Sequence, residues 1–199
     1  MTDAVLYVEE FFASAEVDAL QRYLIDREAD FVASEVINGD NGGCYDDDYR
    51  RSKVLYDVAD VYPFFADRLM ECFPYVVDRL GQPMFDVGQI ELQLTVSGDR
   101  QWFKAHRDSG HDAVETRAVT FVYYCHREPR SFQGGELLIF GDDDNISDQE
   151  ASHEQVRLSP SQNSIVFFPS NFLHEVLPIS CTSGSFGDGR LTYNGWFHK

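Results

Sequence analysis

The chain has 199 residues, of which 34 are acidic and 16 are basic, and its formal net charge is −18. This length allows one domain with a sizeable core, so we expect a single domain over residues 1–199. The charge repels polyanions and argues against nucleic acid as a partner, and no run of about 18 apolar residues occurs that would predict a membrane span.

Two features indicate the compartment. The first residues, MTDAVLYVEEFF, lack the basic start and the cleavage site of a signal peptide, so we expect a cytoplasmic protein. The four cysteines are widely spaced, which indicates free thiols and neither a zinc knuckle nor a disulfide framework.

The N-terminal part of the chain predicts two helices. After a candidate N-cap at Ser14, apolar residues at helical spacing predict a helix over about residues 14–28, which should pack against a sheet. A second helical pattern covers residues 65–80, where Pro74 should kink or split the helix and Gly81 suits its end.

Two other segments have the composition of loops. Residues 38–51, NGDNGGCYDDDYRR, are rich in glycine, asparagine and aspartate and predict a loop. Residues 141–155 form an acidic linker between two strand patterns, and their spacing does not fit an EF-hand.

From about residue 89 the hydrophobic period changes to two. In IELQLTVS, residues 90–97, apolar and polar side chains alternate as in a half-buried strand. Helices followed by strands predict an α+β domain, with a helical entry over about residues 1–85 and a β-sandwich, barrel or jelly roll over about 86–199. Four further runs have strand character: residues 117–124, 134–140, 163–168 and 190–197.

The segment FKAHRDSGHD carries the first candidate metal ligands. Residues two apart in a strand point to the same side, so His106 and Asp108 should project together while Arg107 faces away. We expect His111 and Asp112 to be loop residues. An H-x-D triplet alone equally fits a salt-bridged pair on the surface.

A third candidate ligand, His174, follows an apolar stretch in FFPSNFLHEVLPI. Two histidines and one carboxylate on adjacent strands would form a facial triad suited to Fe(II) and oxygen chemistry. The same ligands could hold zinc in a hydrolase, and a buried, hydrogen-bonded structural histidine is the alternative for His174 itself.

Arg190 is a candidate anion-binding residue. It opens the last strand pattern, and Thr192 should face the same way. An arginine in an apolar barrel is costly unless it meets an anion, and its planar fork suits a carboxylate. A structural salt bridge is the alternative.

Together these motifs resemble the iron- and 2-oxoglutarate-dependent dioxygenases, in particular the branch similar to prolyl 4-hydroxylases. The resemblance rests on H-x-D, the distal histidine in HEV-x-P, R-x-T, and the runs RAVTFVYY, FQGGELLIF and RLTYNGWFH in the family's order. It covers about residues 88–198. It implies a double-stranded β-helix, or jelly roll, with N-terminal supporting helices.

The resemblance also implies roles for individual residues. Fe(II) would be held by His106, Asp108 and His174, and the distal carboxylate of 2-oxoglutarate by Arg190, Thr192 and the hydroxyl of Tyr124. Trp196 matches a wall residue near the iron-binding histidine. Ascorbate binding is a further property that the resemblance implies.

The chain departs from the family pattern in two places. Where members often carry a tyrosine before the H-x-D histidine, this chain has Ser97. The spacing from His174 to Arg190 is longer than in compact prolyl hydroxylases, and we interpret residues 180–189 as a loop insertion. Loops 38–52 and 181–189 are candidates for the pocket mouth.

The resemblance implies an oxidoreductase that hydroxylates an unactivated C–H bond of an amino acid, a peptidyl residue such as proline, or a natural-product intermediate. It would use O2 and release succinate and CO2, and the carboxylate ligand favours hydroxylation over halogenation. The alternatives are a non-catalytic metal-binding jelly-roll module and a cupin-type metal hydrolase. The substrate is expected to be a small molecule or a peptide, and the oligomeric state is not predicted.

Overall fold

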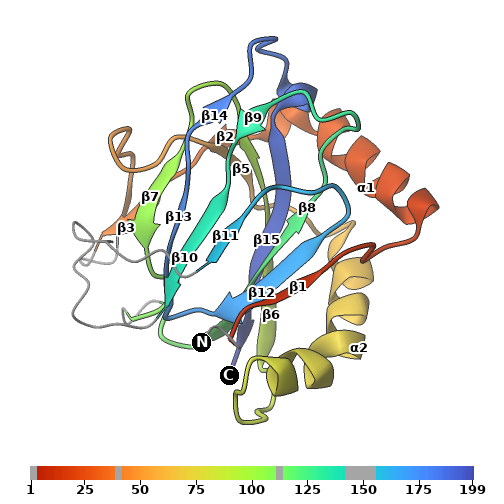
Figure 1. Cartoon of the computed structure of the whole chain (residues 1–199), viewed down its shortest axis with the longest axis vertical. Helices are drawn as coiled ribbons and strands as arrows, with labels where there is room; N and C mark the ends of the chain where they lie inside the picture. The colour runs from red at the N-terminus through yellow and green to blue at the C-terminus, as the bar shows by residue number, and fades with distance from the viewer. Residues whose placement is uncertain (1–3, 39–41, 111–113, 142–155) are drawn as a thin grey trace.

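The computed structural model describes residues 4–38, 42–110, 114–141 and 156–199 (Figure 1). Its strands form two main antiparallel sheets and two short two-stranded pairs. The predictions for His111 and Asp112, and for nearly all of the acidic linker, lie outside the described residues. Within the described ranges, no helix is long and apolar enough to cross a membrane.

The larger sheet has seven strands, and the last strand of the chain lies at its centre. This last strand pairs with one neighbour on each side along nearly its whole length. From edge to edge the order is β1 (Leu6–Val8), β12 (Ile165–Pro169), β8 (Arg117–Tyr124), β15 (Arg190–His198), β6 (Gln89–Ser97), β5 (Lys53–Leu55) and β2 (Val32–Ala33).

The smaller sheet has four strands and faces the larger one across a cavity. Two facing antiparallel sheets of this kind form the double-stranded β-helix, so the predicted fold class is confirmed. The strand order is β11 (Val156–Leu158), β10 (Leu137–Gly141), β13 (Leu173–Val176) and β7 (Phe103–His106). The short pairs are β9 (Gln133–Gly134) with β14 (Ile179–Ser180), and β3 (Val36–Asn38) with β4 (Gly42–Cys44).

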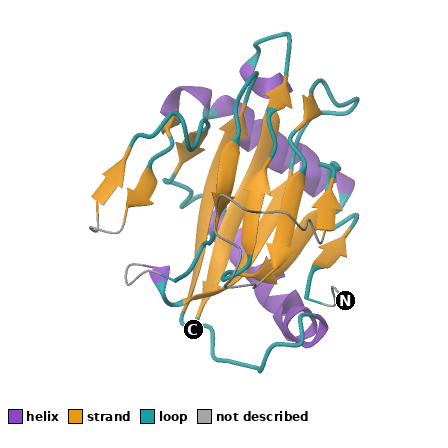
Figure 2. Cartoon of the chain, turned by 60° about the vertical axis from the view of Figure 1, so that its left-hand side comes forward, coloured by secondary structure: helices purple, strands orange, loops and turns teal. Residues whose placement is uncertain are grey.

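The two helices lie on the outer face of the larger sheet (Figures 1 and 2). α1 (Ser14–Asp26) and α2 (Tyr62–Arg79) contribute buried leucine, valine and phenylalanine side chains to the main core. Single 3₁₀ turns follow α1 and precede β15, at η1 (Glu28–Asp30) and η3 (Phe186–Asp188). The helices therefore cover the face of the sheet that points away from the cavity.

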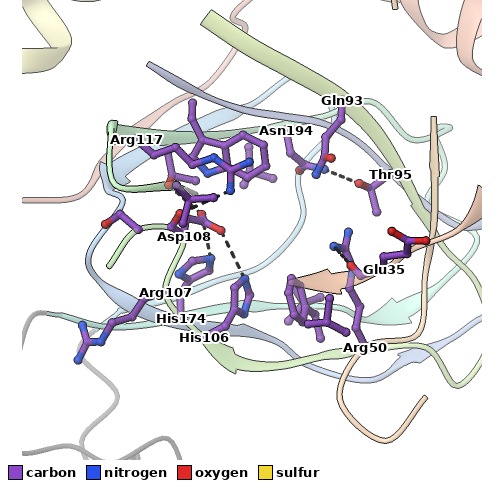
Figure 3. A pocket seen from close by; sticks show the side chains of 18 of the residues that line it. Glu35, Arg50, Gln93, Thr95, His106, Arg107, Asp108, Arg117, His174 and Asn194 are labelled. Atoms are coloured by element: carbon purple, nitrogen blue, oxygen red, sulfur yellow. Dashed lines mark hydrogen bonds and ion pairs between the residues drawn. The ribbon is translucent and has the colours of Figure 1, made fainter. Parts of the chain in front are cut away.

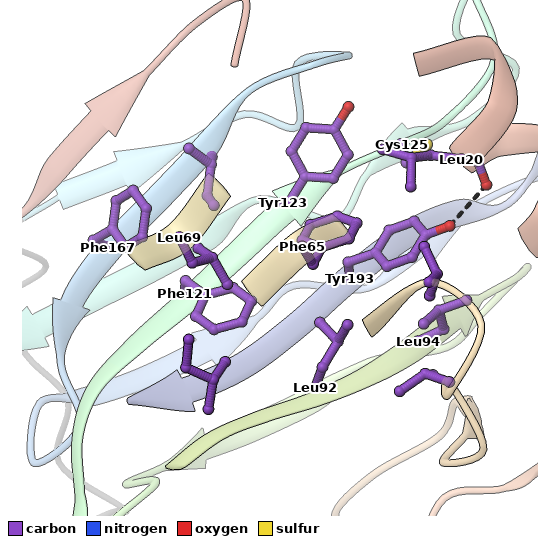
Figure 4. Packing of buried hydrophobic residues seen from close by; sticks show 14 of the residues in the cluster. Leu20, Phe65, Leu69, Leu92, Leu94, Phe121, Tyr123, Cys125, Phe167 and Tyr193 are labelled. Carbon is purple, nitrogen blue, oxygen red and sulfur yellow. Dashed lines mark hydrogen bonds between the residues drawn. The ribbon is translucent and has the colours of Figure 1, made fainter. Parts of the chain in front are cut away.

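Strand alternation assigns each side chain of the central strands to the core or to the cavity. On β8, Phe121 and Tyr123 pack in the core with the helices, whereas Thr120 and Val122 line the cavity. In the core, the Tyr193 hydroxyl donates a hydrogen bond to the Leu20 carbonyl at 2.7 Å, which ties β15 to α1 (Figure 4). The period of two thus positions the residues of β15 that line the cavity: Arg190, Asn194 and Trp196.

The helix predictions are correct in position and differ in detail. Ala13 is the N-cap of α1, because Ser14 is already helical, and the Glu16 carboxylate accepts a hydrogen bond from the Ala13 N–H at 2.7 Å. α2 runs through Pro74 without being split. In Figure 1 its last turns leave the direction of the first turns, as expected of an internal proline.

Three segments carry more strand structure than the sequence predicted. The entry segment supplies β1, β2 and β5 to the larger sheet in addition to the helices. The predicted loop over residues 38–51 contains β4, and the predicted insertion over residues 180–189 contains the end of β14 and all of η3. Backbone pairing creates these strands where side-chain periodicity gives no signal, whereas η3 is a local 3₁₀ turn.

Candidate functional site

Three side chains with metal-ligating atoms meet beside the end of β7. His106 and His174 are register partners on the antiparallel strands β7 and β13, and Asp108 follows β7 by two residues. His106 Nε2 lies 3.7 Å from Asp108 Oδ1, and His174 Nε2 lies 3.4 Å from Asp108 Oδ2. The ligating atoms of all three residues lie within 4.8 Å of one another.

Backbone carbonyls orient both imidazoles. Nδ1 of His106 lies 2.8 Å from the Lys104 carbonyl oxygen, and Nδ1 of His174 lies 2.9 Å from the Phe172 carbonyl oxygen. A carbonyl oxygen can only accept a hydrogen bond, so in the neutral form of each imidazole Nδ1 carries the proton and Nε2 keeps its lone pair. This is the tautomer in which a histidine binds a metal through Nε2.

The Asp108 carboxylate is buried and held by groups from other strands. The Thr120 hydroxyl on β8 donates to Asp108 Oδ2 at 2.8 Å, and the Asp108 N–H donates to the Ser170 carbonyl at 2.9 Å. Burial by itself would raise the pKa of Asp108, but the neighbouring His174 and His106 and hydrogen bonds to the carboxylate keep that pKa below its usual value. The carboxylate is therefore negative at neutral pH.

The His106 imidazole stays neutral. Burial, followed by the neighbouring His174, lowers the pKa of His106 to about 3. The Phe103 ring stacks on the imidazole with 3.5 Å between ring centres and fixes its plane. A neutral imidazole in a fixed orientation is available as a ligand across the physiological pH range.

The donor set of His106, Asp108 and His174 fits a divalent transition metal. Two neutral imidazoles and one carboxylate on one side of a metal make the facial triad of non-heme Fe(II) sites. The two-residue spacing predicted that His106 and Asp108 would converge, and they do, although β7 itself ends at His106. Arg107 points away from the cluster, as predicted, and donates to the Asn171 carbonyl (Figure 3).

Arg190 reaches the same cavity from β15 and is 3% exposed. Its Nε donates to the Gly135 carbonyl at 2.9 Å, and one terminal nitrogen lies 3.5 Å from the Tyr124 hydroxyl. Among the described residues no carboxylate pairs with Arg190. The alternative of a structural salt bridge is therefore wrong for the described part of the chain, and a buried cation is left for an anionic ligand.

The other predicted cosubstrate residues lie close to Arg190. Tyr124 and Thr192 are fully buried register partners on β8 and β15. The Thr192 hydroxyl donates to the Thr95 carbonyl at 3.4 Å, so it also ties β15 to β6. Ser97, at the position of the family's tyrosine, is the register partner of Arg190 and lines the cavity.

The cavity has a volume of about 900 Å³ and is bounded by both sheets and by the β3–β4 region (Figure 3). This volume suits a ligand of the size of a small molecule or of one or two peptide residues. Gln93, Thr95 and Asn194 supply polar groups to its wall, where the Asn194 amide donates to the Thr95 hydroxyl at 2.8 Å.

The sequence did not predict the residues that support Trp196, which forms part of the cavity wall. Arg117 binds the Glu91 carboxylate with nitrogen–oxygen distances of 2.8 and 3.0 Å, and its guanidinium lies 3.6 Å from the centre of the Trp196 ring. His198 Nε2 lies 3.1 Å from Glu91 Oε2. These residues come from three strands of the larger sheet, so only the sheet register could have brought them together.

Comparison with known proteins gives a match to one family. Residues 92–198 match the model of the 2OG-Fe(II) oxygenase superfamily. The chain is 30% identical over 195 residues to an uncharacterised PKHD-type hydroxylase, sll0191, of Synechocystis sp., a match that covers 96% of this chain and 62% of the relative. It is 36% identical over 153 residues to prolyl 3-hydroxylase sudestada1 of Drosophila melanogaster, covering 72% of this chain and 27% of that protein.

The chain thus spans less than two thirds of the length of both curated relatives. Among solved structures, a Pseudomonas putida prolyl-4-hydroxylase superposes with a TM-score of 0.68 at 20% identity, covering 100% of this chain and 94% of the other. A prolyl hydroxylase from Trichoplax adhaerens, solved with a peptide fragment of hypoxia inducible factor, gives 0.68 at 17% identity, with 99% and 84% covered. These likenesses show a shared fold.

Proposed function

Because the chain belongs to the 2OG-Fe(II) oxygenase superfamily, we propose that it is an Fe(II)- and 2-oxoglutarate-dependent hydroxylase. The observation that carries the proposal is that one cavity holds both a His-Asp-His cluster and a buried arginine without a described counter-ion. If the cluster or the arginine were part of a structural ion pair, it would not be available for a ligand. A zinc hydrolase would need the metal ligands but not the buried arginine.

In this proposal His106, Asp108 and His174 hold Fe(II), and Arg190 binds the distal carboxylate of 2-oxoglutarate. The bound metal and cosubstrate supply the oxidation of a C–H bond by O2, with release of succinate and CO2. A metal held by these three residues alone would keep further coordination positions for the cosubstrate and O2.

The protein's own groups orient and shield the reactants. Thr120 and the Ser170 carbonyl keep the Asp108 carboxylate in place, while the Lys104 and Phe172 carbonyls keep both imidazoles in the ligating tautomer. The Tyr124 ring, 5.0 Å from the Arg190 guanidinium carbon, shields the arginine from water and strengthens its attraction for a carboxylate.

The substrate class is also a proposal. The Drosophila relative is named a prolyl 3-hydroxylase, so a prolyl residue is one candidate, beside a free amino acid or another small molecule. We further propose that the protein acts in the cytoplasm as one domain, and that ascorbate supports turnover by keeping the metal reduced.

The proposal predicts iron-dependent release of succinate from 2-oxoglutarate, including slow turnover without substrate. Asp108→Ala should abolish this activity because the metal loses its anionic ligand. Asp67→Ala, which removes an exposed carboxylate of α2, is the matched control and should keep wild-type activity. Succinate release is followed by mass spectrometry with and without added Fe(II).

Full succinate release by Asp108→Ala would show that the metal assignment is wrong. Activity that requires zinc and no oxygen would identify a hydrolase instead.

A further inference from the structure

A second arginine, Arg50, lines the same cavity from the segment that precedes β5. Its guanidinium carbon lies 4.5 Å from the centre of the Phe103 ring, and that ring stacks on His106 with 3.5 Å between ring centres. One aromatic ring therefore separates a guanidinium group from a candidate metal ligand. Figure 3 shows Arg50 pointing into the cavity, on the other side of His106 from Asp108.

Arg50 has no described counter-ion. Its Nε donates to the Ser52 hydroxyl at 2.9 Å, and one terminal nitrogen donates to the Glu35 backbone carbonyl at 3.4 Å. Both acceptors are neutral, and no carboxylate of the described residues forms an ion pair with it. Burial lowers the pKa of Arg50 to about 10, so the group remains charged at neutral pH.

The arginines that line the cavity differ in whether a carboxylate of the described residues neutralises them and in whether they point into the cavity. Arg117 is neutralised by Glu91, and Arg107 points out of the cavity (Figure 3). Arg190 and Arg50 are left as cavity cations without a described carboxylate partner. Arg190 is buried and Arg50 is partly buried, and a guanidinium that is withdrawn from water favours an anionic partner, so two anionic groups are expected in the loaded site.

The backbone around Arg50 is fixed to the edge of the smaller sheet. Arg50 forms an antiparallel bridge with Phe103, the Lys104 N–H donates to the Tyr49 carbonyl at 2.9 Å, and the Tyr49 hydroxyl donates to the Ala105 carbonyl at 2.8 Å. Ser52, which holds the Arg50 side chain, is itself hydrogen-bonded to Ser34 at 2.8 Å. The guanidinium is thus presented from a rigid support, as a specificity-determining group requires.

We propose that Arg50 binds a carboxylate of the substrate, so that the natural substrate is an acid whose carboxylate lies close to the carbon that is oxidised. This inference rests on the proposed function and deepens it. The two carboxylates of 2-oxoglutarate are assigned to Arg190 and to the metal, so Arg50 is left for the second reactant. A free amino acid meets this requirement. A peptide also meets it if the residue next to the oxidised one is acidic or is the C-terminal residue.

The test compares acids with their primary amides as stimulators of 2-oxoglutarate turnover. The probes are the free amino acids and short peptides that end in proline, each as the carboxylic acid and as the amide. In the wild type, at least one acid should raise succinate release above the substrate-free rate and gain one oxygen, while its amide should be at least about 30-fold less effective in kcat/KM.

Arg50→Gln should remove the preference for the acid, because the kcat/KM for the acid should fall by about 30-fold or more. In Arg50→Lys the kcat/KM for the acid should lie between the values of the wild type and of Arg50→Gln. In Arg50→Gln the KM for 2-oxoglutarate should change far less than the kcat/KM for the acid. Equilibrium dialysis of the most effective acid against the purified protein should show the same loss of binding. The matched control is Arg51→Gln, because Arg51 lies over the Trp102 ring and donates to the Asp47 carbonyl outside the cavity.

Amides that work as well as the acids, or a panel in which no acid raises turnover, would overturn the inference. A raised KM for 2-oxoglutarate in Arg50→Gln would also overturn it and assign Arg50 to the cosubstrate. A wild type that releases no succinate from 2-oxoglutarate in the absence of substrate would instead contradict the proposed function.

Discussion

The Asp108 carboxylate is positioned by a hydroxyl rather than by a second charge. Thr120 approaches from the opposite sheet and donates to Asp108 Oδ2 at 2.8 Å, and the Thr120 oxygen also lies 3.0 Å from the Ser170 hydroxyl. This small network is buried, and each member has a partner. Such a contact fixes the direction of the carboxylate without neutralising it, so the charge stays available for a metal.

Thr120→Val should therefore weaken Fe(II) binding while the fold is kept, because valine has the shape of threonine but cannot donate to Asp108. We expect about a 10- to 100-fold increase in the dissociation constant for Fe(II), measured by anaerobic titration. Thr182→Val, at an exposed loop position, should bind Fe(II) like the wild type. Equal affinity in Thr120→Val and wild type would show that the hydroxyl has no such role.

At the residue scale the chemistry of the ligands was predictable and their surroundings were not. The spacing of His106 and Asp108 and the arginine of R-x-T named residues that line one cavity, whereas Thr192 is buried beside Arg190 and does not line it. The orienting groups, Thr120 and the backbone carbonyls, carry no sequence signal. The role of Arg50 was not predicted, because its place in the cavity and the neutrality of its contacts appear only after folding.

β15 is the element on which the site depends most. It pairs with β6 and β8, buries Tyr193 and Phe197 against the helices, and presents Arg190 and Trp196 to the cavity. Both functions require the strand to keep its register, because a shift by one residue would exchange the two faces.

Gly195 lets β15 lie close to its neighbours. A Cβ at this position would lie 1.9 Å from the Glu91 carbonyl oxygen and 2.5 Å from the Phe121 ring. Gly195→Ala should lower the free energy of unfolding by about 1–3 kcal/mol, measured by urea denaturation, because the strands must separate to admit the methyl group. Gly88→Ala, whose Cβ would have 3.8 Å to its nearest neighbour, is the control and should change stability little.

If Gly195→Ala were as stable as Gly88→Ala, the close packing of β15 against Glu91 would not contribute to the stability of the fold.

At the element scale, strong periodicity gave reliable predictions. The runs at residues 90–97, 117–124 and 190–197 correspond closely to β6, β8 and β15. The β3–β4 pair was missed because its asparagine and glycines have a loop composition, and its pairing depends on backbone hydrogen bonds. Likewise, the run over residues 134–140 is divided at Gly134 and Gly135, whose positive φ values end β9 before β10 begins.

The whole molecule is strongly acidic, and the lining of its cavity contains both arginines and carboxylates. The net charge is −18, yet Arg50 and Arg190 lie in the cavity without described counter-ions. The seven-stranded and four-stranded sheets bring the metal cluster and Arg190 together from positions far apart in the chain. That convergence depends on the topology of the jelly roll, which the sequence indicated through the order of its motifs and not through any single segment.

The most direct test of the account is an anaerobic titration of the protein with Fe(II) and 2-oxoglutarate, followed by visible absorption. The wild type should develop a weak charge-transfer band at one equivalent of Fe(II), because in the proposed function the cavity would hold the metal and the chelating cosubstrate together. Arg190→Gln should need a higher concentration of 2-oxoglutarate for the same band, and His174→Ala should give none. A wild type without the band, or a band of full intensity in His174→Ala, would contradict the assignment of this cavity as the Fe(II) and 2-oxoglutarate site.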